Sequence, residues 1–89
     1  MSAPFNVYTV TWCPHCIRCL EFLDREGIAY RNFDVETDDA VWHRALALTH
    51  QVDIVPVVET GGEAKWGAFN ADFEQWLRER ARRDQPRRR

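Results

Sequence analysis

Residues 12–16 are Trp12-Cys13-Pro14-His15-Cys16, and this stretch decides how the rest of the sequence is interpreted. Two cysteines three positions apart are typical of a dithiol that closes to a disulfide. Proline is favoured at the first position of a helix, so we expect a helix to begin directly after Cys13. The unpaired N–H groups at such a helix start stabilise a thiolate, which makes Cys13 the predicted nucleophile.

The residues on either side of this stretch predict a strand and a helix. Residues 5–10 are rich in aromatic and β-branched side chains, as buried strands are. One apolar helical face follows, made of Cys16, Cys19, Leu20 and Leu23. Gly27 is the expected end of this helix. Residues 28–35 form the next predicted strand, so the first three elements make a βαβ unit with parallel strands.

The second half of the chain predicts a helix, a hairpin and a last helix. Thr37 or Asp38 can cap the first of these helices, whose apolar stripe is made of Val41, Ala45 and Leu48. Residues 54–60 form a strand, and a two-glycine turn joins it to a partner at residues 63–66. Asn70 can cap the last helix, which buries Phe73, Trp76, Leu77 and Ala81. The expected order is β-α-β-α-β-β-α.

Composition fits one small folded domain. The chain has 89 residues, 45% of them hydrophobic, and 4 tryptophans, which favours a globule over a disordered chain. No apolar stretch approaches the roughly 20 residues of a membrane span. The first four residues lack the pattern of a signal peptide, so the expected location is cytoplasmic. The 3 cysteines lie too close together in sequence for the disulfide framework of a secreted mini-protein.

The net charge of −2 conceals an acidic body and a basic end. Residues 1–77 carry 5 basic and 12 acidic side chains, whereas residues 78–89 carry 7 basic and 2 acidic ones. The basic tail over residues 83–89 can contact nucleic acid or an acidic partner, but short charged termini are most often solvated and disordered. We therefore expect a monomeric domain over residues 1–82 with no nucleic-acid partner.

Three segments resemble the short glutaredoxins of the thioredoxin superfamily. They are residues 11–18, residues 52–58 with Pro56 near their middle, and residues 61–69. The resemblance covers about residues 5 to 82. It implies a thioredoxin-like α/β fold of the glutaredoxin type, in which three helices flank a four-stranded mixed sheet. In that family the proline that matches Pro56 has a cis peptide bond, and the backbone of the preceding Val55 would dock a peptide or a thiol tripeptide beside the thiols.

The residues and the resemblance together predict individual roles. Cys13 would attack a substrate disulfide, and Cys16 would resolve the mixed disulfide. Pro14 and His15 would tune the thiolate: an imidazolium would stabilise it, whereas a solvent-facing His15 would have little effect. Cys19 is expected in the core, because an iron–sulfur cluster generally takes four thiolates. The predicted substrate-binding residues are Trp12, Arg18, Val55, Pro56, Trp66, Gly67, Ala68 and Phe69.

The expected function is a thiol-disulfide oxidoreductase that reduces protein disulfides, or mixed disulfides with low-molecular-weight thiols, without a bound cofactor or metal. The electron donor stays open. Residues 66–69 look like those of ribonucleotide-reductase redoxins, which take electrons from thioredoxin reductase and NADPH. Thr11-Trp12 and Ile17-Arg18 resemble the mycoredoxins, which use low-molecular-weight thiols such as mycothiol, while His15 departs from the tyrosine usual in glutathione-using glutaredoxins. The alternative is a non-catalytic iron–sulfur or zinc carrier that uses the same cysteines.

Overall fold

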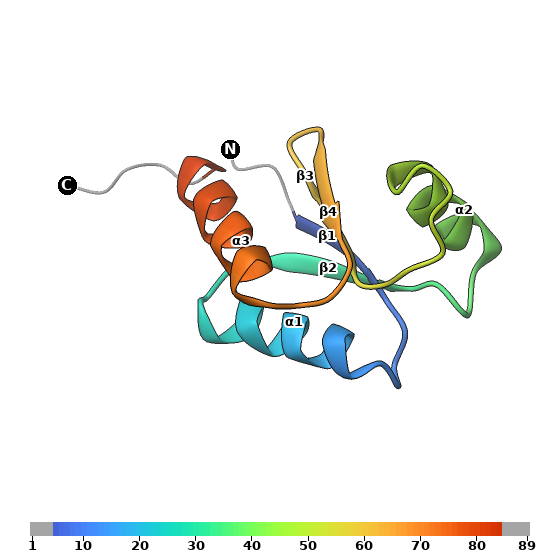
Figure 1. Cartoon of the computed structure of the whole chain (residues 1–89), viewed down its shortest axis with the longest axis horizontal. Helices are drawn as coiled ribbons and strands as arrows, with labels where there is room; N and C mark the ends of the chain where they lie inside the picture. Colours follow the sequence, from blue (N-terminus) through green and yellow to red (C-terminus); the bar gives the residue numbers. More distant parts are fainter. Residues whose placement is uncertain (1–4, 85–89) are drawn as a thin grey trace.

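The computed structural model describes residues 5–84, and these residues have the predicted order of elements (Figure 1). The elements are β1 (Phe5–Thr9), α1 (Pro14–Arg25), β2 (Tyr30–Asp34), α2 (Asp39–Leu48), β3 (Val57–Thr60), β4 (Glu63–Trp66) and α3 (Ala71–Asp84). The strands lie in the order β2-β1-β3-β4, with β1 parallel to β2 and antiparallel to β3, and β3 antiparallel to β4. This mixed sheet confirms the predicted fold.

Helices cover both faces of the sheet (Figure 1). Side chains alternate between the two faces along a strand, so each face supports its own core. One core joins α1, α3 and one face of the sheet, and it includes Phe22, Val58 and Phe73. The other joins α2 to the opposite face and includes Tyr8 and Ala45. Because α1 leaves β1 at once and returns to the parallel β2, the turn between β1 and α1 lies at the carboxyl edge of both strands.

The two ends of α1 are set by local sequence. Cys13 is the N-cap in an extended conformation, and the following proline begins the helix. At the other end Gly27 has a φ of +70°, and its N–H donates to the Asp24 carbonyl at 3.1 Å. The Ile28 N–H donates to the Leu23 carbonyl at 2.9 Å. These two bonds make a Schellman motif, whose left-handed position suits glycine, and the chain reverses there toward β2.

Polar side chains cap the other two helices. Asp38, one of the two predicted residues, caps α2 by accepting a hydrogen bond from the Ala40 N–H at 2.9 Å. Asn70 accepts from the Phe73 N–H at 3.1 Å and so begins α3 as predicted. None of the helices within residues 5–84 is both long and apolar enough to cross a membrane.

Several boundaries differ from those expected. β1 ends at Thr9 instead of residue 10, and β2 spans Tyr30–Asp34 instead of residues 28–35. β3 begins at Val57 instead of residue 54, because Pro56 has no N–H to donate to a neighbouring strand. The bond between Val55 and Pro56 is cis. α3 continues to Asp84, past residue 82 where the domain was predicted to end. Residues 85–89 of the predicted basic tail lie outside the described residues.

Candidate active site

The two cysteines of the Cys-Pro-His-Cys stretch lie at the start of α1. Cys13 is partly exposed, and its side chain forms no capping hydrogen bond. Cys16 lies one turn further along the helix and is 1% exposed. Cys19 is completely buried, as predicted for a core residue. All three are free thiols, so the site presents one accessible sulfur with a shielded thiol directly behind it.

Burial changes the acidity of the two inner thiols. The pKa of Cys16 is raised to about 12, chiefly by burial and also by the hydrogen bond and charge of Cys13. A hydrogen bond from the Val10 backbone acts in the opposite direction. Burial also raises the pKa of Cys19 to about 12, with a smaller contribution from the charge of Cys16. Both inner thiols therefore keep their protons at neutral pH.

His15 connects the cysteine turn to the loop before α3. Its Nδ1 accepts a hydrogen bond from the Phe69 backbone N–H at 3.1 Å. The Arg18 guanidinium lies 2.9 Å from the same nitrogen. Because a backbone N–H and an arginine side chain only donate, Nδ1 is the acceptor in both contacts. An imidazolium would lose both bonds, so tuning of the thiolate by a charged His15 stays a prediction.

The side chain of Phe69, a predicted substrate-binding residue, is largely buried. It is only 7% exposed, and its ring centroid lies 5.7 Å from that of Phe22 and 5.2 Å from that of Phe73. Most of the Phe69 ring therefore lies in the core between α1 and α3, and its small exposed part lines a groove that Arg18 also lines, so a role of Phe69 in substrate binding stays a prediction. Its backbone N–H still belongs to the site through His15. The neighbouring Ala68 is exposed.

The loop with the cis peptide bond lies close to the thiols. Cys13, Val55 and Trp66 all pack against the core that contains Cys16. Pro56 is buried, and its carbonyl accepts a hydrogen bond from the Gly67 N–H at 3.3 Å. Neither the N–H nor the C=O of Val55 is paired with another backbone group within residues 5–84. That backbone is therefore free to pair with an extended segment of a substrate.

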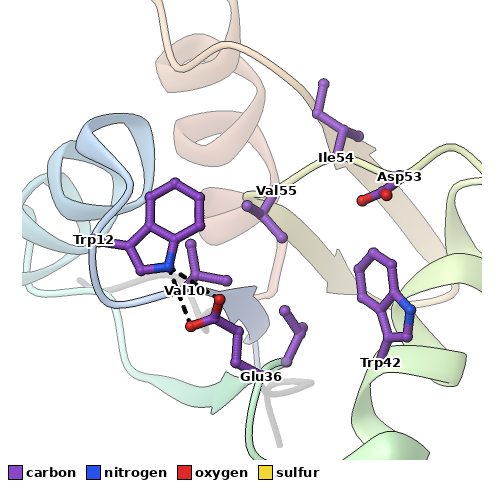
Figure 2. A pocket seen from close by; sticks show the side chains of 8 residues that line it. Val10, Trp12, Glu36, Trp42, Asp53, Ile54 and Val55 are labelled. Carbon is purple, nitrogen blue, oxygen red and sulfur yellow. Dashed lines mark hydrogen bonds between the residues drawn. The ribbon is translucent and has the colours of Figure 1, made fainter.

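A cavity of about 470 Å³ opens beside this loop. Figure 2 shows the indole rings of Trp12 and Trp42 on opposite sides of the cavity, with Val55 between them. Glu36 and Asp53 add two carboxylates to its lining. The Trp12 Nε1–H donates to both carboxylate oxygens of Glu36, at 3.0 and 3.2 Å. This bond holds an indole that is 68% exposed against the end of β2.

Three residues that line the cavity were not predicted as site residues from the sequence: Glu36, Trp42 and Asp53. One signal was available for Glu36. It follows the second predicted strand, and the carboxyl ends of parallel strands meet at one edge of a sheet. Asp53 had no such signal, because the path of the loop between α2 and β3 decides where it lies.

Arg18 lies apart from this cavity. It lines a separate groove of about 250 Å³ between α1 and the start of α3, together with Asn70 and Glu74. The predicted substrate-binding residues therefore do not share one surface. Trp12 and Val55 line the cavity, whereas Arg18 belongs to the groove.

Metal ligands do not come together in the described part of the chain. Within residues 5–84 no three His, Cys, Asp or Glu side chains are placed to hold one metal ion. Cys13 and Cys16 would supply two ligands, whereas structural zinc sites and iron–sulfur clusters generally take four. A carrier function would need ligands from another molecule.

Comparison with known proteins identifies the family. The glutaredoxin family model matches residues 6–64, and the chain belongs to the glutaredoxin family. A glutaredoxin of Pseudomonas aeruginosa is 43% identical over 28 residues, a match that spans 32% of this chain and only 33% of that relative.

Two solved structures share the fold over most of their length. The thioredoxin-like protein BC3987 is 36% identical with a TM-score of 0.71, over 82% of this chain and 97% of that one. The NrdH-redoxin of Escherichia coli, a glutaredoxin-like protein with a thioredoxin-like activity profile, is 27% identical with a TM-score of 0.64, over 83% and 93% of the two chains. The fold is that of the thiol oxidoreductases of this family, with Cys13 and Cys16 close together at its candidate active site.

We expect iodoacetamide to modify only Cys13 in the reduced protein near neutral pH. Cys16 and Cys19 are buried and protonated there, and the thiolate is the reactive form. As the pH rises toward 12, Cys16 loses its proton and a second modification should appear. Mass spectrometry of proteolytic fragments locates each label. Labelling of Cys16 near neutral pH in a Cys13→Ser variant would contradict this assignment.

The bond between His15 and Phe69 predicts different effects for two substitutions. His15→Phe leaves the Phe69 N–H without its acceptor and should lower the free energy of unfolding by about 1 kcal/mol. His15→Asn should lower it less, because an amide oxygen can occupy the place of Nδ1. Urea denaturation of the reduced proteins measures both effects. Equal stability of the two variants would show that the bond contributes nothing.

The same variants test the tuning of the thiolate. Their reduction potentials are measured by equilibration with defined glutathione buffers. If a charged His15 stabilises the Cys13 thiolate, both variants should have a lower reduction potential than the wild type. If His15 only holds the Phe69 backbone in position, the reduction potential should change in His15→Phe and stay unchanged in His15→Asn.

Proposed function

We propose that this protein is a dithiol oxidoreductase of the cytoplasm that reduces disulfides in proteins, and mixed disulfides between proteins and low-molecular-weight thiols. One observation carries the proposal. A partly exposed Cys13 at the N-terminus of α1 lies one turn before a buried, protonated Cys16. A cytoplasmic location fits this chemistry, because thiols stay reduced in that compartment.

The reaction begins at Cys13. Its thiolate attacks one sulfur of the substrate disulfide, the bond between the two substrate sulfurs breaks, and the departing thiolate takes a proton from solvent. Cys16 then gives up its proton and attacks the Cys13 sulfur. The second substrate sulfur leaves as a thiol. Two electrons have passed to the substrate, and the protein is left with a disulfide between Cys13 and Cys16.

The acidity of Cys16 sets the order of these steps. A protonated thiol is a poor nucleophile, so Cys16 does not compete with Cys13 for the substrate. Its burial also keeps dissolved disulfides away from it. Once the mixed disulfide forms, Cys16 is already held beside the sulfur it must attack, which makes the second step intramolecular.

The surface around Cys13 supports an extended polypeptide as substrate. Val55 packs on the same core as Cys13 and has a free backbone N–H and C=O within the described residues. A substrate strand paired there would place its disulfide near Cys13. Trp12 lines the cavity with Val55, and Trp66 packs against the same core as Val55, so both would contact the flanking side chains.

The oxidised protein needs an electron donor, and thioredoxin reductase with NADPH is the proposed one. Two observations support this choice over glutathione. Glu36 and Asp53 line the cavity that Trp12 and Val55 also line, so they would repel the carboxylates of a glutathione molecule bound there. The similar NrdH-redoxin is a protein with a thioredoxin-like activity profile.

Substitution of the two cysteines separates their roles. Cys13→Ser should abolish reduction of insulin disulfides, because the attacking sulfur is lost. Cys16→Ser should also stop insulin reduction but retain part of the activity on mixed disulfides with glutathione, where external thiol can resolve the intermediate. Cys19→Ala is the matched control, since its sulfur takes no part. Wild-type rates in Cys13→Ser would remove the assignment of the nucleophile.

The choice of donor is tested by NADPH consumption with insulin as acceptor. At matched concentrations we expect thioredoxin reductase to support faster turnover than glutathione with glutathione reductase, and mycothiol with its reductase serves as a third arm. Faster turnover with either small thiol would reject the proposed donor. The chemistry of Cys13 and Cys16 would stand in that case.

A further inference from the structure

We propose that the cavity between Trp12 and Trp42 is a recognition site for a lysine or arginine side chain next to the target cysteine of a protein substrate. This inference rests on the proposed function, since it names the class of disulfide that the thiols reduce. Three observations lead to it: the aromatic walls of the cavity, its charge, and its position.

The walls suit a long side chain with a positive end. The two indole rings lie on opposite sides of the space, one from the turn between β1 and α1 and one from α2, with the apolar side chain of Val55 between them (Figure 2). Ile54 adds to the lining. Lysine and arginine pack their aliphatic stems on apolar surface and keep the charged group at its edge. A cation over an indole face gains further attraction from the ring.

The negative charge of the cavity favours a positively charged ligand. Glu36 and Asp53 both line it, and no basic side chain within residues 5–84 forms an ion pair with either. The Trp12 Nε1–H is a neutral donor, so the bond to Glu36 orients that carboxylate without cancelling its charge. A bound cation would meet two carboxylates, whereas a carboxylate would be repelled by both.

The position of the cavity ties this selection to the reaction. Trp12 precedes Cys13 in the chain, and Val55 lies on the same core as Cys13. A substrate strand paired with the Val55 backbone presents alternate side chains to opposite sides. A residue close to the target cysteine then faces the space between the indoles. The cavity thus binds a side chain near the target disulfide, whereas Cys13 and Cys16 carry out the disulfide exchange.

The test compares two synthetic disulfide-linked peptides that differ only in the residues flanking the cysteines, lysine in one and glutamate in the other. Pre-reduced protein is mixed with each peptide, and single-turnover rates are followed by acid quench and chromatography. We expect the lysine peptide to be reduced about tenfold faster at low salt, at about threefold per carboxylate. Because exposed charges are screened, the ratio of the two rates should fall as salt is added.

The double variant Glu36→Gln/Asp53→Asn should bring this ratio close to one. Glutamine at position 36 still offers an oxygen to the Trp12 Nε1–H, so the cavity wall is kept. The matched control is Glu26→Gln/Glu79→Gln, which removes the same charge at the far end of α1 and on α3 and should keep the wild-type ratio.

Equal rates for the two peptides in the wild type, or an unchanged ratio in the double variant, would overturn the inference. Either result would leave the proposed function intact, because both peptides would still be reduced. Failure of the wild type to reduce either peptide would instead overturn the proposed function, and the inference with it.

Discussion

The packing of Cys16 and Cys19 on the inner side of α1 fixes where Cys13 lies. Both inner sulfurs are buried, Cys16 against the core shared with α2 and Cys19 against the core shared with α3. A helix anchored on two cores cannot rotate about its axis without exposing one of them. The N-cap position, and with it the Cys13 sulfur, is therefore held at the edge of the sheet where β1 ends. The other residues of the candidate site lie around the Cys13 sulfur.

The thiols and the cavity that we propose to select the substrate come from different parts of the chain. The thiols belong to the turn between β1 and α1, whereas Glu36 follows β2, Trp42 lies on α2, and Asp53 lies in the loop before β3. Thr49 holds that loop in place, since its hydroxyl donates to the Val52 carbonyl at 2.7 Å and accepts from the Val52 N–H at 3.1 Å. Exposed residues of the loop can vary without moving the thiols, so one fold can serve different partners.

Local patterns predicted most of the fold, because they depend on neighbours in the chain. The Asn70 cap, the Gly27 turn and the burial of Cys19 all follow from spacing and residue type. Contacts between distant segments could not be predicted in this way. No local pattern showed that the Phe69 ring enters the core or that His15 accepts its N–H. The meeting of carboxylates from two separate loops at one cavity likewise depends on how the sheet and α2 pack.

Cys19 can serve as a probe for the opening of the core in which it is buried. Its sulfur is completely buried where α1 meets α3 and the sheet, and its pKa of about 12 keeps it protonated in the native state. A thiol reagent can reach it only when that core separates, so its rate of modification measures how often the core opens. In a Cys13→Ser/Cys16→Ser variant, modification of Cys19 thus reports the free energy of opening of this core without an introduced cysteine.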